Sequence, residues 1–213
     1  SVFSPFEITK NNYLASVSIF TAAVNEKVDR IIFCSSMARY GGQQTPFTEN
    51  KKPSPVDPYA ISKVASEEVL KNLCELNNIE WVIAVPHNII GPRQKYDDPF
   101  RNVVSIMINR MLQGKAPIIY GDGKQLRNFP YVMDVADVII KSIFLEAPDI
   151  LLNCGSTNSH NINDIVKTVT DLLAGNEKKH LYSQHKNVHS DYPDFVLSME
   201  RAKKHNIYLN TDL

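Results

Sequence analysis

A tyrosine and a lysine four residues apart, Tyr59 and Lys63, form the sharpest chemical signal in the sequence. Side chains four positions apart on a helix share one face, so the phenol and the ammonium group point the same way. A phenol with a pKa of about 10 is a poor base at neutral pH, but a neighbouring cation favours its ionised form. Pairs with this spacing also arise by chance in many helices, so the interpretation depends on the surrounding residues.

Polar residues follow two short apolar segments of the chain. Ser35 and Ser36 come just after the segment 30–34, and His87 and Asn88 come just after the segment 81–86. Ligands of parallel sheets bind at the carboxyl ends of the strands. We therefore expect both pairs of residues to lie at one site, where the Ser36 hydroxyl could share a proton with Tyr59 and a substrate oxygen.

The elements that position these residues follow from the hydrophobic pattern. Helical spacing of apolar residues predicts helices over 8–25 and 59–77, and the apolar runs 30–34 and 81–85 predict strands, the first of them buried on both faces. The proline-rich segment 39–58 predicts a long surface loop. This alternation is typical of an α/β fold with a parallel sheet and crossover helices.

Beyond residue 92 the pattern is looser and predicts a smaller, mixed α/β lobe. The expected helices lie near 100–113, 134–146 and 162–174, and the expected strands near 117–120 and 150–154. We therefore predict two parts, residues 1–91 and residues 92–213, with the second mainly binding substrate.

The composition gives no general reason to expect binding to nucleic acid or to a membrane surface. In 213 residues, 23 lysines and arginines balance 23 aspartates and glutamates. No apolar run reaches the roughly 18 residues that span a bilayer. The three separated cysteines (Cys34, Cys74 and Cys154) predict buried free thiols in a reducing compartment, so we expect a cytoplasmic protein.

The segment from Arg93 to Arg127 carries a local excess of positive charge. It holds seven basic residues against three acidic ones. Such an excess suits an anionic diphosphate, which arginine binds well through its planar guanidinium group. The alternative is a solvated surface of mixed charge.

Several motifs, taken in order, resemble the extended short-chain dehydrogenase/reductase family, and within it the NAD-dependent nucleotide-sugar epimerases and dehydratases. The resemblance runs over roughly residues 5–205. The motifs that carry it are Asn11–Asn12 with Thr21–Ala23, Phe33–Gly41, Pro58–Lys63, Asn88–Gln94, Ile119–Gly123 with Gln125, Arg127 and Phe129, and Asn153–Gly155. It implies a partial Rossmann-like, doubly wound parallel sheet with a smaller substrate-binding lobe.

The resemblance also implies roles for particular residues. The catalytic residues would be Ser36, Tyr59 and Lys63. Residues that contact NAD would be Asn12, Ser35, Tyr59, Lys63 and Pro86, and residues that contact the nucleotide sugar would be Asn88 and Arg127. It further implies a homodimer formed through the helices over 8–25 and 59–77.

The residues after Ser36 bear on the type of reaction. Dehydratases of the family have an Asp-Glu pair there, and decarboxylating relatives commonly keep the glutamate, whereas this chain has Met37 and Ala38. We therefore expect epimerisation at C4 through a 4-keto intermediate, with a UDP-hexose or UDP-N-acetylhexosamine as substrate. A dehydratase or reductase relative is an alternative. Val85 stands where relatives often have an arginine, and residues 188–191 lack the second diphosphate-binding arginine, so Arg127 is expected to carry more of the phosphate contact.

The eight glycines do not form the G-x-x-G-x-x-G-like turn that binds the pyrophosphate of a dinucleotide. Gly121 and Gly123 do not form such a turn, because Leu126 stands where its third glycine would be. Two interpretations follow: a fragment of a complete enzyme, or a natural remnant that binds nucleotide sugars or acts as an interaction module without holding NAD.

Two other kinds of site are weaker hypotheses. His180, His185 and His189 lie in one polar stretch, but no acidic or cysteine partner has metal-ligand spacing, so we expect a surface cluster and no metal. Ser36 could belong to a hydrolase triad, but no G-x-S-x-G elbow is present.

Overall fold

Three parallel strands form the central sheet. They are β1 (Arg30–Cys34), β2 (Glu80–Pro86) and β5 (Ile150–Cys154), in the order β1-β2-β5. The register pairs Ile32 with Val82, and Val82 in turn with Ile150. The computed structural model describes residues 3–97, 103–173, 186–188, 193–209 and 211. Within those ranges, no helix has the length and apolar character needed to cross a membrane.

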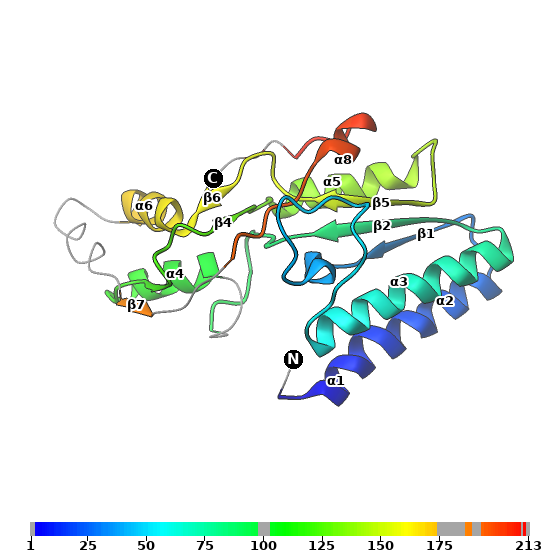
Figure 1. Cartoon of the computed structure of the whole chain (residues 1–213), viewed down its shortest axis with the longest axis horizontal. Helices are drawn as coiled ribbons and strands as arrows, with labels where there is room; N and C mark the ends of the chain where they lie inside the picture. Colours follow the sequence, from blue (N-terminus) through cyan, green and yellow to red (C-terminus); the bar gives the residue numbers. More distant parts are fainter. Residues whose placement is uncertain (1–2, 98–102, 174–185, 189–192, 210, 212–213) are drawn as a thin grey trace.

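Helices cover both faces of this sheet (Figure 1). One face carries a continuous helical segment made of α1 (Pro5–Thr9), the π-helical turn η1 (Lys10–Leu14) and α2 (Ala15–Asn25), together with α3 (Pro58–Asn77). The other face carries α5 (Val132–Ile143) and α8 (Glu200–Lys204). The predicted α/β fold with a parallel sheet is confirmed.

The strand residues alternate between two cores, as the pleat of a strand requires. Ile83 of β2 belongs to a core with Phe20 and Leu70 from α2 and α3. Val82 belongs to the opposite core, with Val138 of α5. All five of these side chains are buried, so β2 is the buried centre of the sheet.

β1 differs from its expected burial. Ile31 and Phe33 are buried, but Ile32 is only partly buried and Cys34 is exposed. The reason is that β1 is the outer strand of the described sheet, so the prediction of a strand buried on both faces is wrong. The prediction of buried free thiols holds for Cys74 and Cys154 and is wrong for Cys34.

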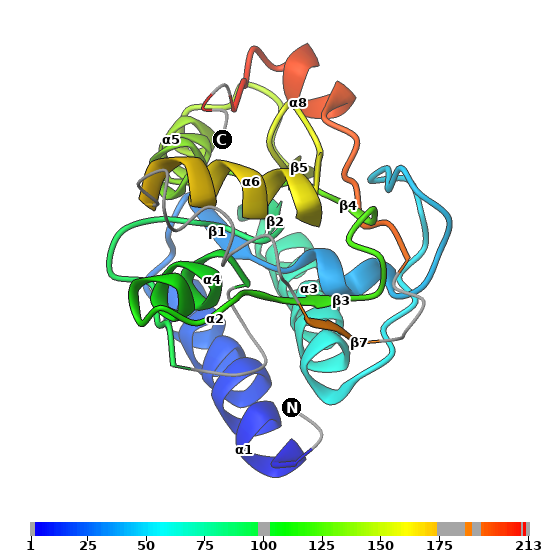
Figure 2. The same cartoon turned by 90° about the vertical axis from the view of Figure 1, so that its left-hand side faces the viewer.

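A second group of elements lies beyond the ends of the sheet strands (Figure 2). It contains α4 (Val103–Leu112), β3 (Ile118–Tyr120), β4 (Leu126–Arg127), β6 (His160–Asn161), α6 (Ile162–Leu173) and β7 (Lys186–Val188). α4 packs on α6 around the buried Met107 and Ile165, β3 pairs with β7 in parallel, and β4 pairs with β6 antiparallel. The division of the chain at residue 91 stays a prediction. The structure shows that β5, from the later part of the chain, joins the first sheet, and that α5 packs against this sheet.

The loop after β1 is anchored by specific contacts. It starts with the 3-10 helix η2 (Met37–Tyr40). The buried Phe47 stacks on Tyr40 with ring centroids 5.0 Å apart, and the Tyr40 hydroxyl donates to Asn153 Oδ1 over 2.8 Å. Gly41 has φ +58°, and a Cβ there would lie 2.0 Å from the Ser54 carbonyl oxygen, so only glycine fits. These contacts hold in place the loop that follows Ser36.

Candidate active site

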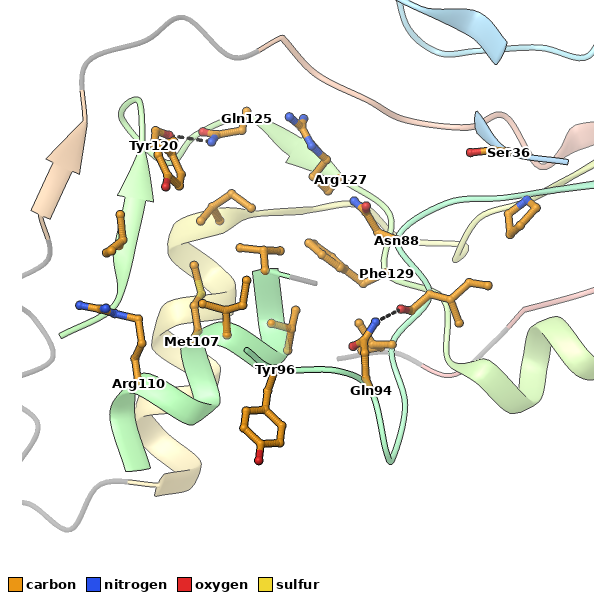
Figure 3. A pocket seen from close by; sticks show the side chains of 18 of the residues that line it. Ser36, Asn88, Gln94, Tyr96, Met107, Arg110, Tyr120, Gln125, Arg127 and Phe129 are labelled. Carbon is orange, nitrogen blue, oxygen red and sulfur yellow. Dashed lines mark hydrogen bonds between the residues drawn. The ribbon is translucent and has the colours of Figure 1, made fainter. Parts of the chain in front are cut away.

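A cavity of 1020 Å³ opens where the carboxyl ends of β1 and β2 meet α4, β3 and β4 (Figure 3). Its volume is just above the range of about 300–1000 Å³ that is typical of small-molecule sites. The predicted site residues among those that line it are Ser35, Ser36, Tyr59, Pro86, Asn88 and Arg127. Residues that are far apart in the sequence therefore line one cavity.

Tyr59 is placed by the first turn of α3. Asp57 caps this helix, since its Oδ1 accepts a hydrogen bond from the Ala60 N–H over 3.0 Å. Pro58 occupies the first helical turn, where the absence of an N–H costs nothing. This cap-and-proline start fixes the direction of the helix, and Tyr59 lines the cavity.

Ser36 ends the extended segment that follows β1. It is the N-cap of η2, and its hydroxyl oxygen accepts a hydrogen bond from the Ala38 N–H over 3.2 Å. An N-cap residue has non-helical backbone angles, which turn the chain away from the strand direction. The turn leaves the Ser36 side chain at the edge of the cavity (Figure 3).

Lys63 is outside the cavity lining and connects α3 to the end of β1. Its Nζ donates to the Cys34 carbonyl over 2.9 Å and lies 5.9 Å from the centroid of the Tyr59 ring. Burial lowers the pKa of Lys63, while Cys34 and Glu67 act in the opposite direction. The ammonium group therefore holds α3 to the end of β1 next to the phenol.

Arg127 brings a positive charge to the same end of the cavity as Ser36 and Asn88 (Figure 3). Its Nη1 donates to the carbonyl oxygens of Leu126 and Pro193, each over 2.7 Å, and its guanidinium carbon lies 4.5 Å from the centroid of the Phe195 ring. Burial lowers the pKa of Arg127 to about 10, so it remains a cation at neutral pH. These contacts fix the orientation of the side chain.

His87, between Pro86 and Asn88, is buried with 3% of its surface exposed. Burial, and then the nearby Arg127 cation, lower the pKa of His87 to about 3. The imidazole is therefore neutral at physiological pH. No partner for its Nδ1 is found among the described residues.

The far end of the cavity contains residues that the sequence reasoning did not assign to the site. Figure 3 shows there Arg110 from α4, Tyr120 from β3 and the neighbouring Gln125, whose Nε2 donates to the Tyr120 carbonyl over 2.9 Å. Gln94, Tyr96 and Met107 line the opposite wall. Tyr120 and Gln125 belong to a motif of the resemblance and Arg110 to the local basic excess, but no sequence signal marks Tyr96.

Two predicted contact residues, Lys63 and Asn12, lie outside the cavity lining. Asn12 sits in the π-helical turn η1, where its Nδ2 donates to the Ile8 carbonyl over 2.9 Å. Its own carbonyl oxygen accepts a hydrogen bond from the Ser66 hydroxyl of α3 over 3.4 Å. Single π-helical turns of this kind are frequent at functional sites. The roles assigned to Asn12 and to the lining residues stay predictions.

The histidine cluster of His180, His185 and His189 lies outside the described residues. In the described part of the chain, no group of three or more histidine, cysteine, aspartate or glutamate side chains is arranged to hold a metal ion.

Comparison with known proteins adds independent evidence. The family described as "NAD dependent epimerase/dehydratase family" matches residues 1–158. The chain is 34% identical over 169 residues to a putative UDP-glucose 4-epimerase of Methanocaldococcus jannaschii, covering 78% of this chain and 54% of that protein. It is 30% identical over 178 residues to a UDP-N-acetyl-alpha-D-glucosaminuronate decarboxylase of Bacillus cytotoxicus, covering 81% and 54%. The chain thus spans about half the length of the curated relatives it matches.

Solved structures agree with the fold. The UDP-N-acetylglucosamine 4-epimerase from Methanobrevibacter ruminantium in complex with UDP-N-acetylmuramic acid superposes with a TM-score of 0.84 at 31% identity, covering 93% of this chain and 62% of that one. The Thermotoga maritima UDP-glucose 4-epimerase with UDP-glucose has a TM-score of 0.88 at 23% identity, covering 100% and 68%, which supports the fold alone.

Proposed function

Because this chain belongs to the NAD-dependent epimerase/dehydratase family, we propose that it carries the catalytic and sugar-binding residues of a UDP-sugar 4-epimerase. One observation carries the proposal. Ser36, Tyr59 and Arg127 line a single cavity, and the Lys63 ammonium group lies 5.9 Å from the centroid of the Tyr59 ring. A base, a hydroxyl and a fixed cation in one space suit the oxidation of a sugar hydroxyl next to a phosphate-bearing group.

The residues at the ends of β1 and β2 fit one end of a dinucleotide. Tyr59 and Lys63 offer a hydroxyl and an ammonium group that can bind ribose hydroxyls, and Ser35 and Pro86 line the cavity beside them. In this proposal these four residues and Asn12 contact NAD. NAD, when bound, supplies a reversible acceptor for the hydride from C4. The sequence contains no glycine spacing that predicts a site for the pyrophosphate.

The chain's own residues handle the proton. Tyr59 accepts the proton of the sugar 4-hydroxyl, and the Lys63 ammonium group lies 5.9 Å from the centroid of its ring. Ser36 donates a hydrogen bond to the same sugar oxygen and holds it near the phenol. The 4-keto sugar then turns and takes the hydride back at C4 on its other face. Tyr59 returns the proton to the oxygen at C4.

The acid–base content of the cavity favours epimerisation. Elimination of water or loss of carbon dioxide calls for further acid–base groups, and the positions after Ser36 hold Met37 and Ala38. Among the described lining residues the only carboxylate is Asp97. A decarboxylating or dehydrating reaction is the second candidate, because the similar proteins include a decarboxylase and dTDP-D-glucose 4,6-dehydratases.

A UDP-hexose or UDP-N-acetylhexosamine is the proposed substrate. Arg127 lines the same cavity as Ser36 and supplies a cation for the diphosphate, with Asn88 between the two in Figure 3. The cavity continues past Phe129 to Tyr120 and Arg110. Several of the similar proteins act on UDP-sugars according to their names, which agrees with this assignment. We also propose a homodimer formed through α2 and α3.

Turnover of the full-length protein tests the proposed function. With NAD present, UDP-glucose and UDP-N-acetylglucosamine are each incubated with the protein, and the proton resonances of the sugar are followed by NMR. We expect the 4-epimer to accumulate to an equilibrium mixture. Calorimetry on the 213-residue chain should show binding of UDP and much weaker binding of NAD. UDP binding without conversion of either sugar would favour the non-catalytic binding module.

A further inference from the structure

A buried carboxylate lies one helical turn beyond Lys63. Glu67 is on α3 and is 0% exposed. The Ser35 hydroxyl donates a short hydrogen bond to its Oε1, and Arg39 Nε lies 3.1 Å from each of its carboxylate oxygens. Arg39 is itself only 3% exposed, so both charges of this ion pair are removed from water.

Stability alone gives little reason for such a pair. Removing two charges from water costs several kcal/mol per ion, and well-packed apolar residues of the same volume are often equally stable or better. One guanidinium nitrogen of Arg39, Nη1, is buried without a partner among the described residues, which adds to that cost. The pair must therefore be explained by what it holds in place.

The two groups bound by Glu67 lie on either side of Ser36. Ser35 is the preceding residue, and Arg39 belongs to η2, the helical turn that Ser36 caps. Lys63 fixes the backbone at the residue before Ser35, because its Nζ donates to the Cys34 carbonyl. The chain is thus fastened at residues 34, 35 and 39, and Ser36 lies between these points.

We infer that Glu67 is a positioning residue that fixes the distance between Ser36 and Tyr59. Tyr59, Lys63 and Glu67 are four residues apart in turn, so they lie along one face of α3. The helix that presents the phenol also holds, through Glu67, the segment that presents the Ser36 hydroxyl. This inference rests on the proposed function, because only there does the Ser36–Tyr59 geometry affect a reaction.

The first test is Glu67→Gln in the full-length protein with NAD bound. The neighbouring Glu68→Gln is the matched control, since Glu68 is exposed and pairs with Lys71 on the surface. We expect Glu67→Gln to lower kcat by about 10- to 100-fold, as misplacement of reacting groups by about an ångström does. KM for the UDP-sugar should change by less than about two-fold, because Arg127 and Asn88 are untouched. Equal kcat values in the two variants would overturn the inference.

A readout independent of turnover separates this inference from the proposed function. Amide hydrogen exchange of residues 34–40 should become faster in Glu67→Gln and stay unchanged in Glu68→Gln, whether or not the protein turns over the sugars tested. Unchanged exchange in both variants would contradict the positioning role.

A double variant covers the case in which the single variant does not fold. Glu67→Met with Arg39→Met removes both buried charges and keeps the volume, so it should fold as stably as the wild type. We expect its kcat to remain about 10-fold or more below the wild-type value. Wild-type kcat in this stable double variant would show that Glu67 contributes to stability alone and would overturn the inference.

Discussion

At the residue scale, the neutral His87 makes the protein sensitive to acid. A histidine in the unfolded chain has a pKa of about 6.5. In the folded protein, burial beside Arg127 lowers this pKa to about 3. Between these two values the unfolded state binds more protons at this residue, so the free energy of unfolding falls as the pH is lowered.

The expected size of this effect can be measured with His87→Gln. Each pH unit below about 6.5 should cost the wild type up to about 1.4 kcal/mol more than the variant, until the pH reaches the folded pKa. Urea unfolding at pH 7, 6, 5 and 4 gives the difference, in which shared contributions from carboxylates cancel. Parallel pH profiles for the two proteins would show that His87 is not held neutral.

Sequence spacing predicts those residues of the candidate site that a helix or a strand end positions. It does not predict contacts that form only when distant segments pack together. The helical period places Tyr59 and Lys63 on one face, and strand ends place Ser36 and Asn88 at one edge of a sheet. The same period places Glu67 on the face of Tyr59 and Lys63, but no local spacing indicates that Ser35 and Arg39 are its partners. Its partners become visible only when α3 packs against the end of β1.

At the element scale, Arg30 connects the sheet to the end of α5. Its guanidinium donates to the carbonyl oxygens of Ser142, Ile143 and Leu145 over 2.7–2.8 Å, and it pairs with Glu80 of β2. The last carbonyls of a helix have no partner within the helix, and a cation at this end is favourable. Arg30 therefore acts as a cap supplied by a neighbouring strand.

Replacement of Arg30 by methionine should lower the free energy of unfolding by about 2–3 kcal/mol, since charge-assisted hydrogen bonds to helix carbonyls are lost. The exposed Lys141→Met, in the last turn of the same helix, is the control and should change stability by less than about 0.5 kcal/mol. Chemical denaturation measures both. A loss below about 0.5 kcal/mol for the Arg30 variant would refute the capping role.

The elements themselves were largely predictable, and the exceptions have a common cause. The period of apolar residues gives α3 and β2 to within about a residue, because these elements are long and bury one face or both. The two-residue strands β4 and β6 are set by pairing between distant segments, and the exposure of Cys34 depends on which strand is outermost. Neither property is encoded in a local pattern.

At the scale of the whole molecule, α2 and α3 form an outer helical layer (Figure 1). Ile19 of α2 is 66% exposed, Ile61 of α3 is 54% exposed, and Leu14 of the adjoining η1 is 55% exposed. Exposed apolar side chains that form a patch mark an interaction surface. They are the observation in favour of the proposed homodimer.

The variant Ile19→Glu tests this assembly. We expect the wild type to have twice the mass of one chain in light scattering after gel filtration, and the variant to have the mass of one chain, because a buried unpaired carboxylate opposes association. Ile140→Glu, the same replacement of an exposed isoleucine but on α5, should leave the mass unchanged. A monomeric wild type would rule out the proposed homodimer.

The proposed epimerisation depends most on Tyr59, the group that accepts the proton of the sugar hydroxyl. The direct measurement is the rate of C4 epimerisation by the full-length protein carrying Tyr59→Phe, with NAD bound, followed by NMR of the sugar protons. Loss of the phenol oxygen should reduce kcat by at least about 100-fold. The dissociation constant for UDP should stay within about two-fold of the wild-type value, because Arg127 and Asn88 remain in place. Substantial epimerisation by this variant would contradict the account.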